Sequence, residues 1–258
     1  MTRPARNFRP FSFSPRLFER VQGERRELWT EAVGDPPPVY GERWTEVSGH
    51  RCRLFEPGRS KLAAAVVRGW RGDLPAPGER WLYLGAASGT TASHVADLLG
   101  PEGRLYAVER SLRPFSRLLA LSERWPNLRP ILADARDPFA YAGLVPPAEG
   151  VYCDVAQADQ IEIILRNAEL LVRGEGARIL IALKTASMGR HRTAAGHREF
   201  AEKALADKVA LVPSVSLEPF HRGHFLLGGR WGRGARLPDR EAARTTTPRA
   251  RRPGRRAR

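Results

Sequence analysis

Short apolar runs alternate with amphipathic stretches along the middle of the chain, and this alternation predicts its secondary structure. Five of the runs are short enough for buried parallel strands, and they cover residues 81–84, 104–108, 130–133, 151–153 and 178–183. Between them, the spacing of apolar residues predicts helices over 91–99, 113–124, 157–172 and 196–206. Strands that alternate with helices in this way predict an α/β fold with a parallel sheet.

The last part of the pattern departs from this alternation. Two apolar runs, 212–218 and 224–229, are joined only by a turn from Phe220 to Gly223. So short a connection predicts an antiparallel pair, because parallel neighbours need a long crossover. A parallel sheet with a final antiparallel strand is the architecture of Rossmann-like S-adenosylmethionine-dependent methyltransferases, a comparison of folds that by itself says nothing about function.

The chain before residue 81 predicts a smaller unit. Residues 34–58 predict a small antiparallel β subdomain, with two short strands around the turn at Ser48 and Gly49. A Rossmann-like domain then spans 59–231 and opens on a helix with Ser60 as its N-cap. Residues 1–33 are predicted to be a basic arm. Residues 232–258 are predicted to be a disordered Arg-rich tail, because they hold too few apolar residues to form a core.

Net charge adds a candidate partner to this picture. The chain carries a formal charge of +15, and from Arg230 to Arg258 eleven arginines stand against Asp239 and Glu241, which is +9 and leaves +6 for the rest. A basic body with a basic tail favours a polyanionic partner such as nucleic acid, since each neutralised phosphate releases counterions. A solvated basic surface would explain the charge equally well.

Several classes of protein are excluded by composition. Cys52 and Cys153 are too few for a disulfide framework, which indicates a reducing compartment. No apolar run approaches the roughly 18 residues of a membrane helix, and residues 1–20 are basic but lack the apolar segment of a secretory signal. We therefore expect a soluble intracellular protein with no membrane partner, and we expect no metal site.

Small residues follow the first predicted strand, in the order Gly85, Ala86, Ala87, Ser88, Gly89, Thr90 and Thr91. In an open α/β sheet, ligands bind beyond the carboxyl ends of the strands. Small side chains there let the backbone approach a ligand, and the N-terminus of the following helix offers N–H groups to a carboxylate. The segment lacks the G-x-G-x-x-G spacing of dinucleotide-binding folds, and a tight strand-to-helix turn would explain it equally well.

Acidic residues stand at the ends of the next three predicted strands: Glu109, Asp134 and Asp154. Glu109 has the spacing of a residue that accepts both hydroxyls of a ribose. Asp134 is placed to accept an adenine amino group, with Ala135 supplying a backbone contact. Each alone reads most simply as a solvated carboxylate, but three successive strand ends are hard to explain by sheet architecture. Acids suit a cationic sulfonium better than a pyrophosphate, which favours S-adenosyl-L-methionine over a nicotinamide cofactor.

Three further residues are candidates for catalysis. Lys184 directly follows the predicted strand 178–183 and should emerge at the same edge as Asp154. Lys61 lies in the first turn of a helix, where a cation opposes the helix dipole, and His224 opens the last strand. Taken singly, the two lysines read as surface residues and the histidine as a structural one.

Six segments closely resemble the fibrillarin family, in the family's order along the chain. They are RSKLAAA (59–65), LYLGAASGTTASHV (82–95), VER (108–110), DVAQ (154–157), LKTAS (183–187) and LEPFHRGHFLL (217–227). The resemblance spans about residues 34–230, and GAASGTTASHV followed by DVAQ is too specific a combination for chance. It implies a Rossmann-like methyltransferase fold with S-adenosyl-L-methionine as the cofactor.

The resemblance also implies roles for individual residues. Together with the small-residue turn, it predicts cofactor contacts at Gly85, Ala86, Thr90, Thr91, Glu109, Arg110, Asp134, Ala135, Asp154, Val155, Ala156 and Gln157. The family's Lys-Asp-Lys-His tetrad falls on Lys61, Asp154, Lys184 and His224. Two positions depart from the family pattern. Arg110 replaces a common aromatic residue, which puts adenine stacking there in question, and Gly223 replaces the usual Asp before His224.

Methyl transfer from a sulfonium to a hydroxyl requires mainly positioning, together with a base for the weakly acidic hydroxyl. We expect Lys184 to be that base and Lys61 to orient the hydroxyl and stabilise charge developing on its oxygen. His224 would complete the network. Asp154 is the alternative base, because a coupled tetrad titrates as a unit.

The activity that the resemblance implies is 2′-O-methylation of ribose in rRNA, with tRNA as a further target, inside a ribonucleoprotein. A box C/D guide RNA would select the nucleotide, while a Nop-domain scaffold protein and a kink-turn-binding ribosomal-type protein would place the enzyme. The chain shows no RNA-reading motif of its own. It lacks the Gly/Arg-rich N-terminal domain of eukaryotic fibrillarins and resembles the shorter archaeal form, which implies a cytoplasmic protein, or a nucleolar one if eukaryotic.

Other functions compete with this one. A nicotinamide oxidoreductase would need the missing G-x-G-x-x-G turn. A non-catalytic RNA-binding scaffold would explain the charge but not a tetrad in register with the cofactor residues. A stand-alone methyltransferase of RNA or of a protein glutamine stays open within the fold.

Overall fold

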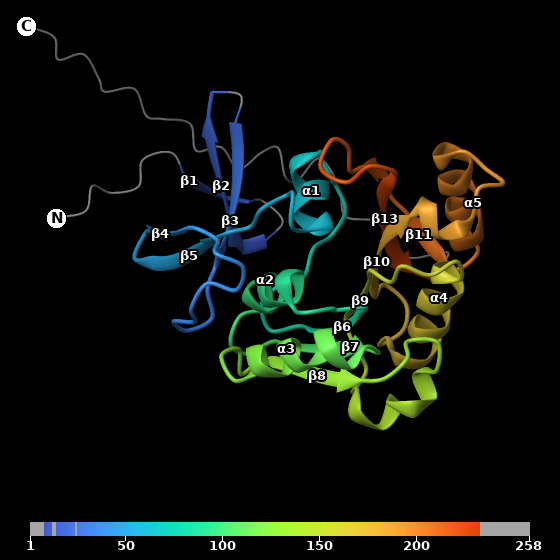
Figure 1. The fold of residues 1–258 in the computed structure, drawn as a ribbon, viewed down its shortest axis with the longest axis horizontal. Helices are drawn as coiled ribbons and strands as arrows, with labels where there is room; N and C mark the ends of the chain where they lie inside the picture. Colours follow the sequence, from blue (N-terminus) through green and yellow to red (C-terminus); the bar gives the residue numbers. More distant parts are fainter. Residues whose placement is uncertain (1–7, 12–13, 24, 233–258) are drawn as a thin grey trace, which may run out of the picture.

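The computed structural model describes residues 8–11, 14–23 and 25–232. It contains a five-stranded antiparallel sheet in the order β1-β2-β3-β5-β4 and an eight-stranded mixed sheet in the order β11-β13-β10-β9-β6-β7-β8, with β12 pairing β13. The smaller sheet lies at one end of the molecule, beside α2, and the larger sheet forms its centre (Figure 1).

The elements alternate as the apolar pattern predicts. The smaller sheet holds β1 (Phe8–Phe11), β2 (Ser14–Gln22), β3 (Arg25–Glu31), β4 (Trp44–Val47) and β5 (His50–Leu54). The larger holds β6 (Arg80–Leu84), β7 (Arg104–Glu109), β8 (Leu128–Leu132), β9 (Gly150–Cys153), β10 (Arg178–Lys184), β11 (Val209–Leu211), β12 (Val215–Ser216) and β13 (His224–Trp231). The helices are α1 (Lys61–Val67), α2 (Thr90–Leu99), α3 (Leu112–Ser122), α4 (Gln160–Leu171) and α5 (Ala194–Ala206), with 3₁₀ turns η1 (Pro138–Ala140), η2 (Ala142–Leu144) and η3 (Thr185–Met188).

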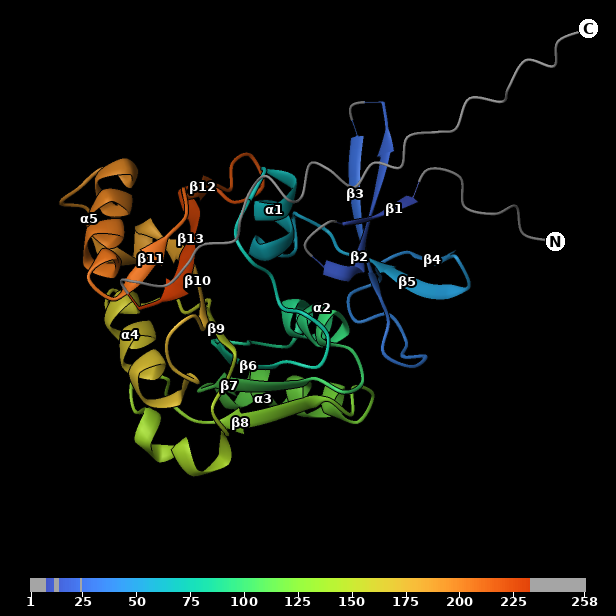
Figure 2. The same ribbon diagram turned by 180° about the vertical axis from the view of Figure 1, so that it is seen from behind.

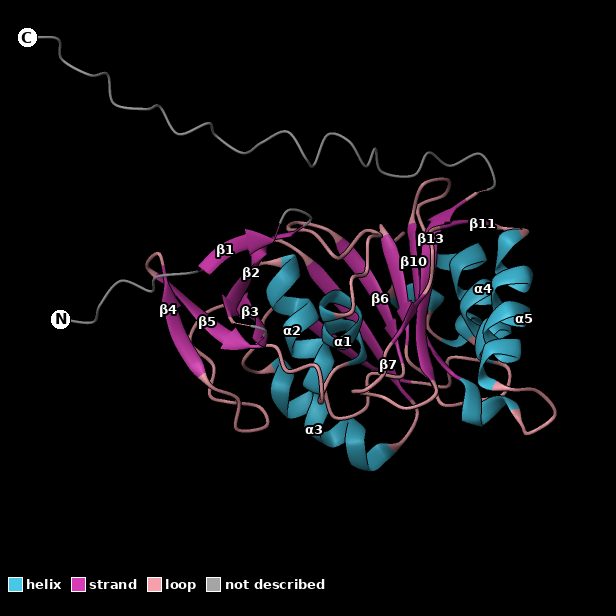
Figure 3. Cartoon of the chain, turned by 90° about the horizontal axis from the view of Figure 1, so that it is seen from above, coloured by secondary structure: helices cyan, strands magenta, loops and turns pink. Residues whose placement is uncertain are grey.

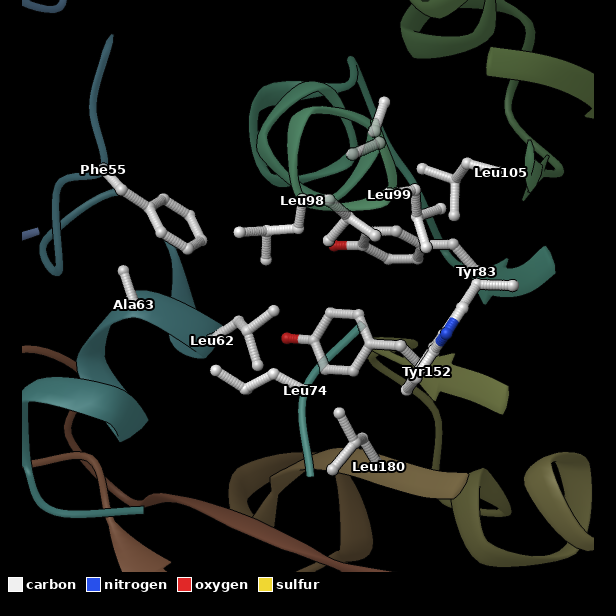
Figure 4. Packing of buried hydrophobic residues seen from close by; sticks show 14 of the residues in the cluster. Phe55, Leu62, Ala63, Leu74, Tyr83, Leu98, Leu99, Leu105, Tyr152 and Leu180 are labelled. Atoms are coloured by element: carbon white, nitrogen blue, oxygen red, sulfur yellow. The ribbon is translucent and has the colours of Figure 1, made fainter. Parts of the chain in front are cut away.

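Helices cover both faces of the larger sheet, with α1, α2 and α3 on one side and α4 and α5 on the other (Figure 3). Alternate residues of β6 therefore belong to two cores. Trp81 and Tyr83 pack in the first core, whereas Leu82 and Leu84 pack in the second. In the first core, the rings of Tyr83 and Tyr152 meet edge to face at 4.8 Å, surrounded by leucines (Figure 4).

The predicted fold class is confirmed. Strands β6 to β10 form the parallel part of the sheet, and β13 runs antiparallel to β10. The predicted final hairpin is present, but its first strand, β12, is only two residues long. Pro213 has no N–H to donate, so pairing to β13 is interrupted beyond the bond from the Val212 N–H to the Gly228 carbonyl. The pattern did not predict β11, which pairs with the same side of β13.

The N-terminal sheet is larger than the pattern indicates. The two predicted strands on either side of the turn at Ser48 and Gly49 are present, and both turn residues have a positive φ. The predicted basic arm is wrong for the described residues before Glu31, which form β1, β2 and β3. Charges on these strands pair across the sheet, as in Arg20 with Glu27, so a buried strand looks polar in the sequence. The rest of the arm (1–7, 12–13 and 24) and the tail beyond Gly232 lie outside the described residues.

A buried polar network attaches this sheet to α2. The Arg53 guanidinium, on β5, is completely buried and donates to Glu42 at 2.7 Å and to Asp97 at 2.9 Å. It also lies over the Trp125 ring, 4.7 Å from the ring centre. Asp97 accepts a further bond from the Val33 N–H at 3.0 Å. Because α2 begins at the small-residue turn, the network holds the helix that carries one wall of the predicted site.

His94 is buried in the same region, and we expect it to make the folded protein less stable in mild acid. Its ring nitrogens hydrogen-bond with the hydroxyls of Thr30 and Tyr40, and burial together with the Arg53 charge lowers its pKa well below 6.5. The unfolded chain binds a proton that the folded chain does not, so the free energy of unfolding should fall as the pH drops below 6.5. The contribution is about 1.4 kcal/mol per pH unit at most.

The measurement is urea unfolding of wild type and His94→Gln between pH 5 and pH 7.5. Glutamine retains hydrogen-bonding capacity but does not titrate, so its plot of unfolding free energy against pH should be flatter than that of wild type. Equal slopes in the two proteins would contradict the assignment to His94.

Candidate active site

The carboxyl ends of the parallel strands bring the predicted residues to one edge of the sheet. Gly85 directly follows β6, Glu109 ends β7 and Asp154 directly follows β9. Lys184 ends β10 and lies opposite His224, the first residue of the antiparallel strand β13. The edge therefore combines strand ends of β6 to β10 with the start of β13.

A cavity of about 410 Å³ opens at this edge. The predicted cofactor residues that line it are Gly85, Glu109, Arg110, Asp134, Ala135, Asp154, Val155, Ala156 and Gln157. Five further lining residues were not among the predicted contacts, although Ala87 belongs to the small-residue turn: Ala87, Val108, Ser111, Ala133 and Ile163. Three predicted contacts do not line the cavity. Ala86 and Thr91 are buried, Thr90 opens α2, and the Thr91 hydroxyl donates to Ser60 at 3.1 Å instead.

The turn after β6 is held closely against the strand beside it. Gly85 has a φ of +79°, and a Cβ there would lie 3.0 Å from the Asp154 carbonyl oxygen, so only glycine fits. Ala87 also has a positive φ, of 49°. The Glu109 carboxylate accepts from the Ala87 N–H at 2.9 Å and from the Ser111 N–H at 2.7 Å. Glu109 therefore stabilises the turn and keeps lone pairs that face the cavity.

Charged side chains connect the outer walls of the cavity. Arg110 forms an ion pair with Asp134, with 3.3 Å between Nη1 and Oδ2. The Arg136 guanidinium donates to both carboxylate oxygens of Asp159, at 2.7 and 2.9 Å, and to Gln157 at 2.8 Å. The Arg136 hydrogen bond lowers the pKa of Asp159. Sequence reasoning missed Arg136, whose one local signal is its place two residues after Asp134.

Two members of the predicted tetrad, Lys61 and Asp154, are in direct contact, whereas Lys184 and His224 make no hydrogen bond or ion pair to them. Lys61 Nζ donates to Asp154 Oδ1 at 2.7 Å. Burial raises the pKa of Asp154, and the positive charge of Lys61 acts against that rise. The His224 Nδ1–H donates to the Arg222 carbonyl at 2.9 Å, and burial lowers its pKa, so the ring is neutral near pH 7 with Nε2 as an acceptor. The Lys184 amine makes no ion pair or hydrogen bond within the described residues.

A second imidazole, His221, was not predicted. Its Nε2–H donates to the Pro57 carbonyl at 2.9 Å, and its ring meets His224 edge to face at 5.9 Å. Burial lowers its pKa as well. His221 thus fastens the segment before Lys61 to the segment before His224. The only feature of the sequence that could have pointed to His221 is its position three residues before His224.

The edge suits proton removal from a hydroxyl beside a bound cation. The edge combines a lysine amine that has no partner among the described residues, a neutral imidazole, and the anchored carboxylate of Asp154, which lines the acid-rich cavity. Within the described ranges, no group of three or more His, Cys, Asp or Glu side chains is placed to hold a metal ion. No helix of the described part of the chain combines the length and apolar character that crossing a membrane requires.

Comparison with known proteins gives consistent matches. The model of the family described as Fibrillarin matches residues 15–233. The chain is 38% identical over 218 residues to the rRNA 2′-O-methyltransferase fibrillarin of Eremothecium gossypii, which covers 83% of this chain but only 64% of that protein. It is 39% identical over 188 residues to the fibrillarin-like rRNA/tRNA 2′-O-methyltransferase of Thermococcus gammatolerans, covering 73% of this chain and 83% of that one.

Solved structures agree. The Methanococcus jannaschii fibrillarin pre-rRNA processing protein superposes with a TM-score of 0.82 at 31% identity, covering 88% of this chain and 97% of that one. Aeropyrum pernix fibrillarin, solved with natively bound S-adenosyl-L-methionine, gives 0.76 at 36% identity over 86% and 97% of the two chains. The fibrillarin of a fibrillarin/Nop5p complex gives 0.73 at 34% identity over 88% and 98%.

Proposed function

The chain belongs to the fibrillarin family, and from that premise we propose that it is an S-adenosyl-L-methionine-dependent RNA ribose 2′-O-methyltransferase. The observation that carries the proposal is the Lys61–Asp154 pair, at 2.7 Å, beside Lys184 and His224 at the mouth of an acid-lined cavity. A non-catalytic scaffold would have no use for this arrangement.

The residues of the cavity fit the cofactor. Glu109 has lone pairs left for ribose hydroxyls, and Asp134 stands at the wall where an adenine amino group would be accepted. Gly85 lines the cavity and lets the turn after β6 lie against Asp154, so both wall segments border the same space. When bound, S-adenosyl-L-methionine supplies a sulfonium whose methyl group is electrophilic. The carboxylate of Asp154 favours that positive charge near the tetrad.

The chain's own residues then handle the hydroxyl. Lys61 anchors the Asp154 carboxylate, and together they hold the ribose hydroxyl in line with the reacting carbon. The Lys184 amine, which pairs with no carboxylate of the described residues, accepts the hydroxyl proton. His224 accepts hydrogen bonds through Nε2 and completes the positioning of the ribose. Most of the rate enhancement comes from this positioning.

Partners follow from the same premise. A Nop-domain protein binds the enzyme, as Nop5p accompanies fibrillarin in the solved complex. We further propose that a box C/D guide RNA pairs with rRNA or tRNA targets and that a kink-turn-binding ribosomal-type protein completes the particle. Base pairing then selects the nucleotide, and the protein reads the backbone and the 2′-hydroxyl. We propose a cytoplasmic location for an archaeal-type enzyme and a nucleolar one if the source is eukaryotic.

The test is methylation by the full chain with labelled S-adenosyl-L-methionine, guide RNA, Nop-domain protein and kink-turn-binding protein. One guide-selected ribose should be labelled, and a target with 2′-deoxyribose at that nucleotide should not. Calorimetry should show binding of S-adenosyl-L-methionine and not of NAD. Labelling that persists without guide RNA would indicate a stand-alone enzyme, and cofactor binding without any transfer would contradict the proposed activity.

A further inference from the structure

About half of the arginines in the described chain form ion pairs, and the exposed arginines that do not include two groups of three. One group is Arg59, Arg190 and Arg222, which we call the arginine rim. The other is the α3 stripe, made of Arg113 and Arg117 on α3 and of Arg124 just beyond its end. None of these six side chains pairs with a carboxylate of the described residues. Arg80, by contrast, pairs with Glu149 at 3.0 Å.

The arginine rim borders the tetrad. Arg59 stands two residues before Lys61, and Arg222 stands two residues before His224. Arg190 lies on the loop after η3, which continues from the end of β10. Arg59 and Arg222 lie just before α1 and β13, and these two elements lie side by side in both views of the ribbon (Figures 1 and 2).

Hydrogen bonds join the three loops into one margin. The Thr185 hydroxyl donates to the Gly223 carbonyl at 2.8 Å, which links the loop after β10 to the loop before β13. His221 Nε2–H donates to the Pro57 carbonyl at 2.9 Å, which links the loop before β13 to the loop before α1. The rim is therefore a continuous edge on the β10, β13 and α1 side of the site.

Charge divides the site into two halves. Glu109, Asp134 and Asp154 line the cofactor cavity on one side, whereas the rim supplies cations on the other. Two carboxylates, Glu56 and Glu218, stand in the rim loops, but neither forms an ion pair with a rim arginine. A polyanion is repelled by the cavity half and attracted by the rim half. The target ribose must reach the tetrad between them.

From this we infer that the arginine rim binds the phosphates on either side of the methylated nucleotide, so that the RNA backbone crosses the site along the β10, β13 and α1 margin. The inference rests on the proposed function and adds the path of the substrate. Guanidinium groups suit the role because they bind phosphate oxygens in pairs and stay charged. Each phosphate contact releases counterions, which makes its contribution measurable through salt.

The α3 stripe is the rival surface. Arg113 and Arg117 lie one turn apart on α3, and Arg124 follows two residues after the helix ends at Ser122. However, α3 packs on β7 and β8, so the cofactor cavity separates it from Lys184 and His224. RNA bound along α3 would hold its phosphates away from the reacting ribose. The stripe therefore provides a matched control with the same number of exposed arginines.

The experiment compares two full-length triple variants, Arg59→Gln/Arg190→Gln/Arg222→Gln and Arg113→Gln/Arg117→Gln/Arg124→Gln. Binding of a paired guide–target RNA duplex is followed by fluorescence anisotropy across a KCl series, a readout that needs no methyl transfer. The rim variant should reduce the slope of log K against log salt by about 2–3, close to one for each lost phosphate contact. The α3 variant should change the slope by less than about 1. The Arg-rich tail is present in all proteins and contributes equally.

A third variant, with lysine at all three rim positions, should retain most of the wild-type slope, because a lysine still neutralises a phosphate. Cofactor affinity by calorimetry should be unchanged in every variant, which shows that each is folded. An unchanged salt slope in the rim variant, or an equal reduction of the slope in the α3 variant, would contradict the inference that the arginine rim binds the RNA phosphates. If RNA binding depends on the rim but the protein transfers no methyl group, the proposal for the rim holds and the proposed function is wrong. If the protein methylates RNA and the salt slope does not depend on the rim, the proposed function holds and the proposal for the rim is wrong.

Discussion

Replacing Lys184 by alanine is expected to lower the single-turnover methylation rate by about 10²–10⁴-fold, the usual contribution of a general base. Of the two tetrad lysines, Lys61 is held by Asp154 at 2.7 Å, whereas the Lys184 amine makes no ion pair with a described residue. Lys184 also lies directly opposite His224 in the sheet. It is therefore the amine best placed to receive a proton.

The arginine variant distinguishes a base from a positioning group. Lys184→Arg should be nearly as slow as the alanine variant, because a guanidinium stays protonated and accepts no proton. The rate of wild type should rise with pH, as expected of base catalysis, and Lys184→Arg should lose that dependence. Cofactor affinity should be unchanged in both variants, since the lost interaction belongs to the transition state.

The measurement is single-turnover methylation of a guide-paired RNA across pH in the assembled particle. Lys203→Ala, which removes an exposed lysine from α5, is the matched control and should behave as wild type. Near wild-type rates in Lys184→Arg would show that Lys184 only positions the substrate. Asp154, whose pKa burial raises, would then be the base.

Replacing Arg53 by methionine is expected to reduce the free energy of unfolding by about 3–5 kcal/mol, the usual cost of breaking a buried ion pair. Methionine has a similar volume, so the change removes charge more than packing. It leaves the carboxylates of Glu42 and Asp97, both fully buried, without their cation. Asp97 retains bonds from Trp125 and Val33, but uncharged donors do not replace a guanidinium.

A neighbouring arginine provides the control for this prediction. Arg51 is two residues earlier on the same strand, is exposed, and pairs with exposed Asp35. Arg51→Met should change stability by less than about 1 kcal/mol, as expected of a surface ion pair. Urea unfolding followed by tryptophan fluorescence and by circular dichroism measures both variants. A loss in Arg53→Met no larger than in Arg51→Met would show that the buried network does not stabilise the fold.

Much of the fold and of the candidate site was predictable because parallel strands end at the same edge of a sheet. Apolar runs located β6 to β10, and the residues that follow them, such as Gly85, Glu109 and Asp154, line one cavity. Local signals of this kind need no knowledge of which element packs against which.

The first three strands of the N-terminal sheet were missed for the opposite reason. Its strands carry many charges, and a charged residue in a strand usually indicates solvent. In the folded protein, Arg16 pairs with Glu31 and Arg53 is completely buried, so the charges satisfy one another. Arg136 and His221 were missed likewise, since their partners Asp159 and Pro57 come from other segments.

The sequence by itself determined the alternation of strands and helices from β6 to β10 and which polar residues stand at those strand ends, because both follow from apolar periodicity over a few residues. Only the tertiary structure decided which charges meet. Lys61 pairs with Asp154 across 93 positions of the chain, and Arg53 pairs with Asp97 across 44. Such pairs depend on how helices and sheets pack against each other, and no local pattern encodes that packing.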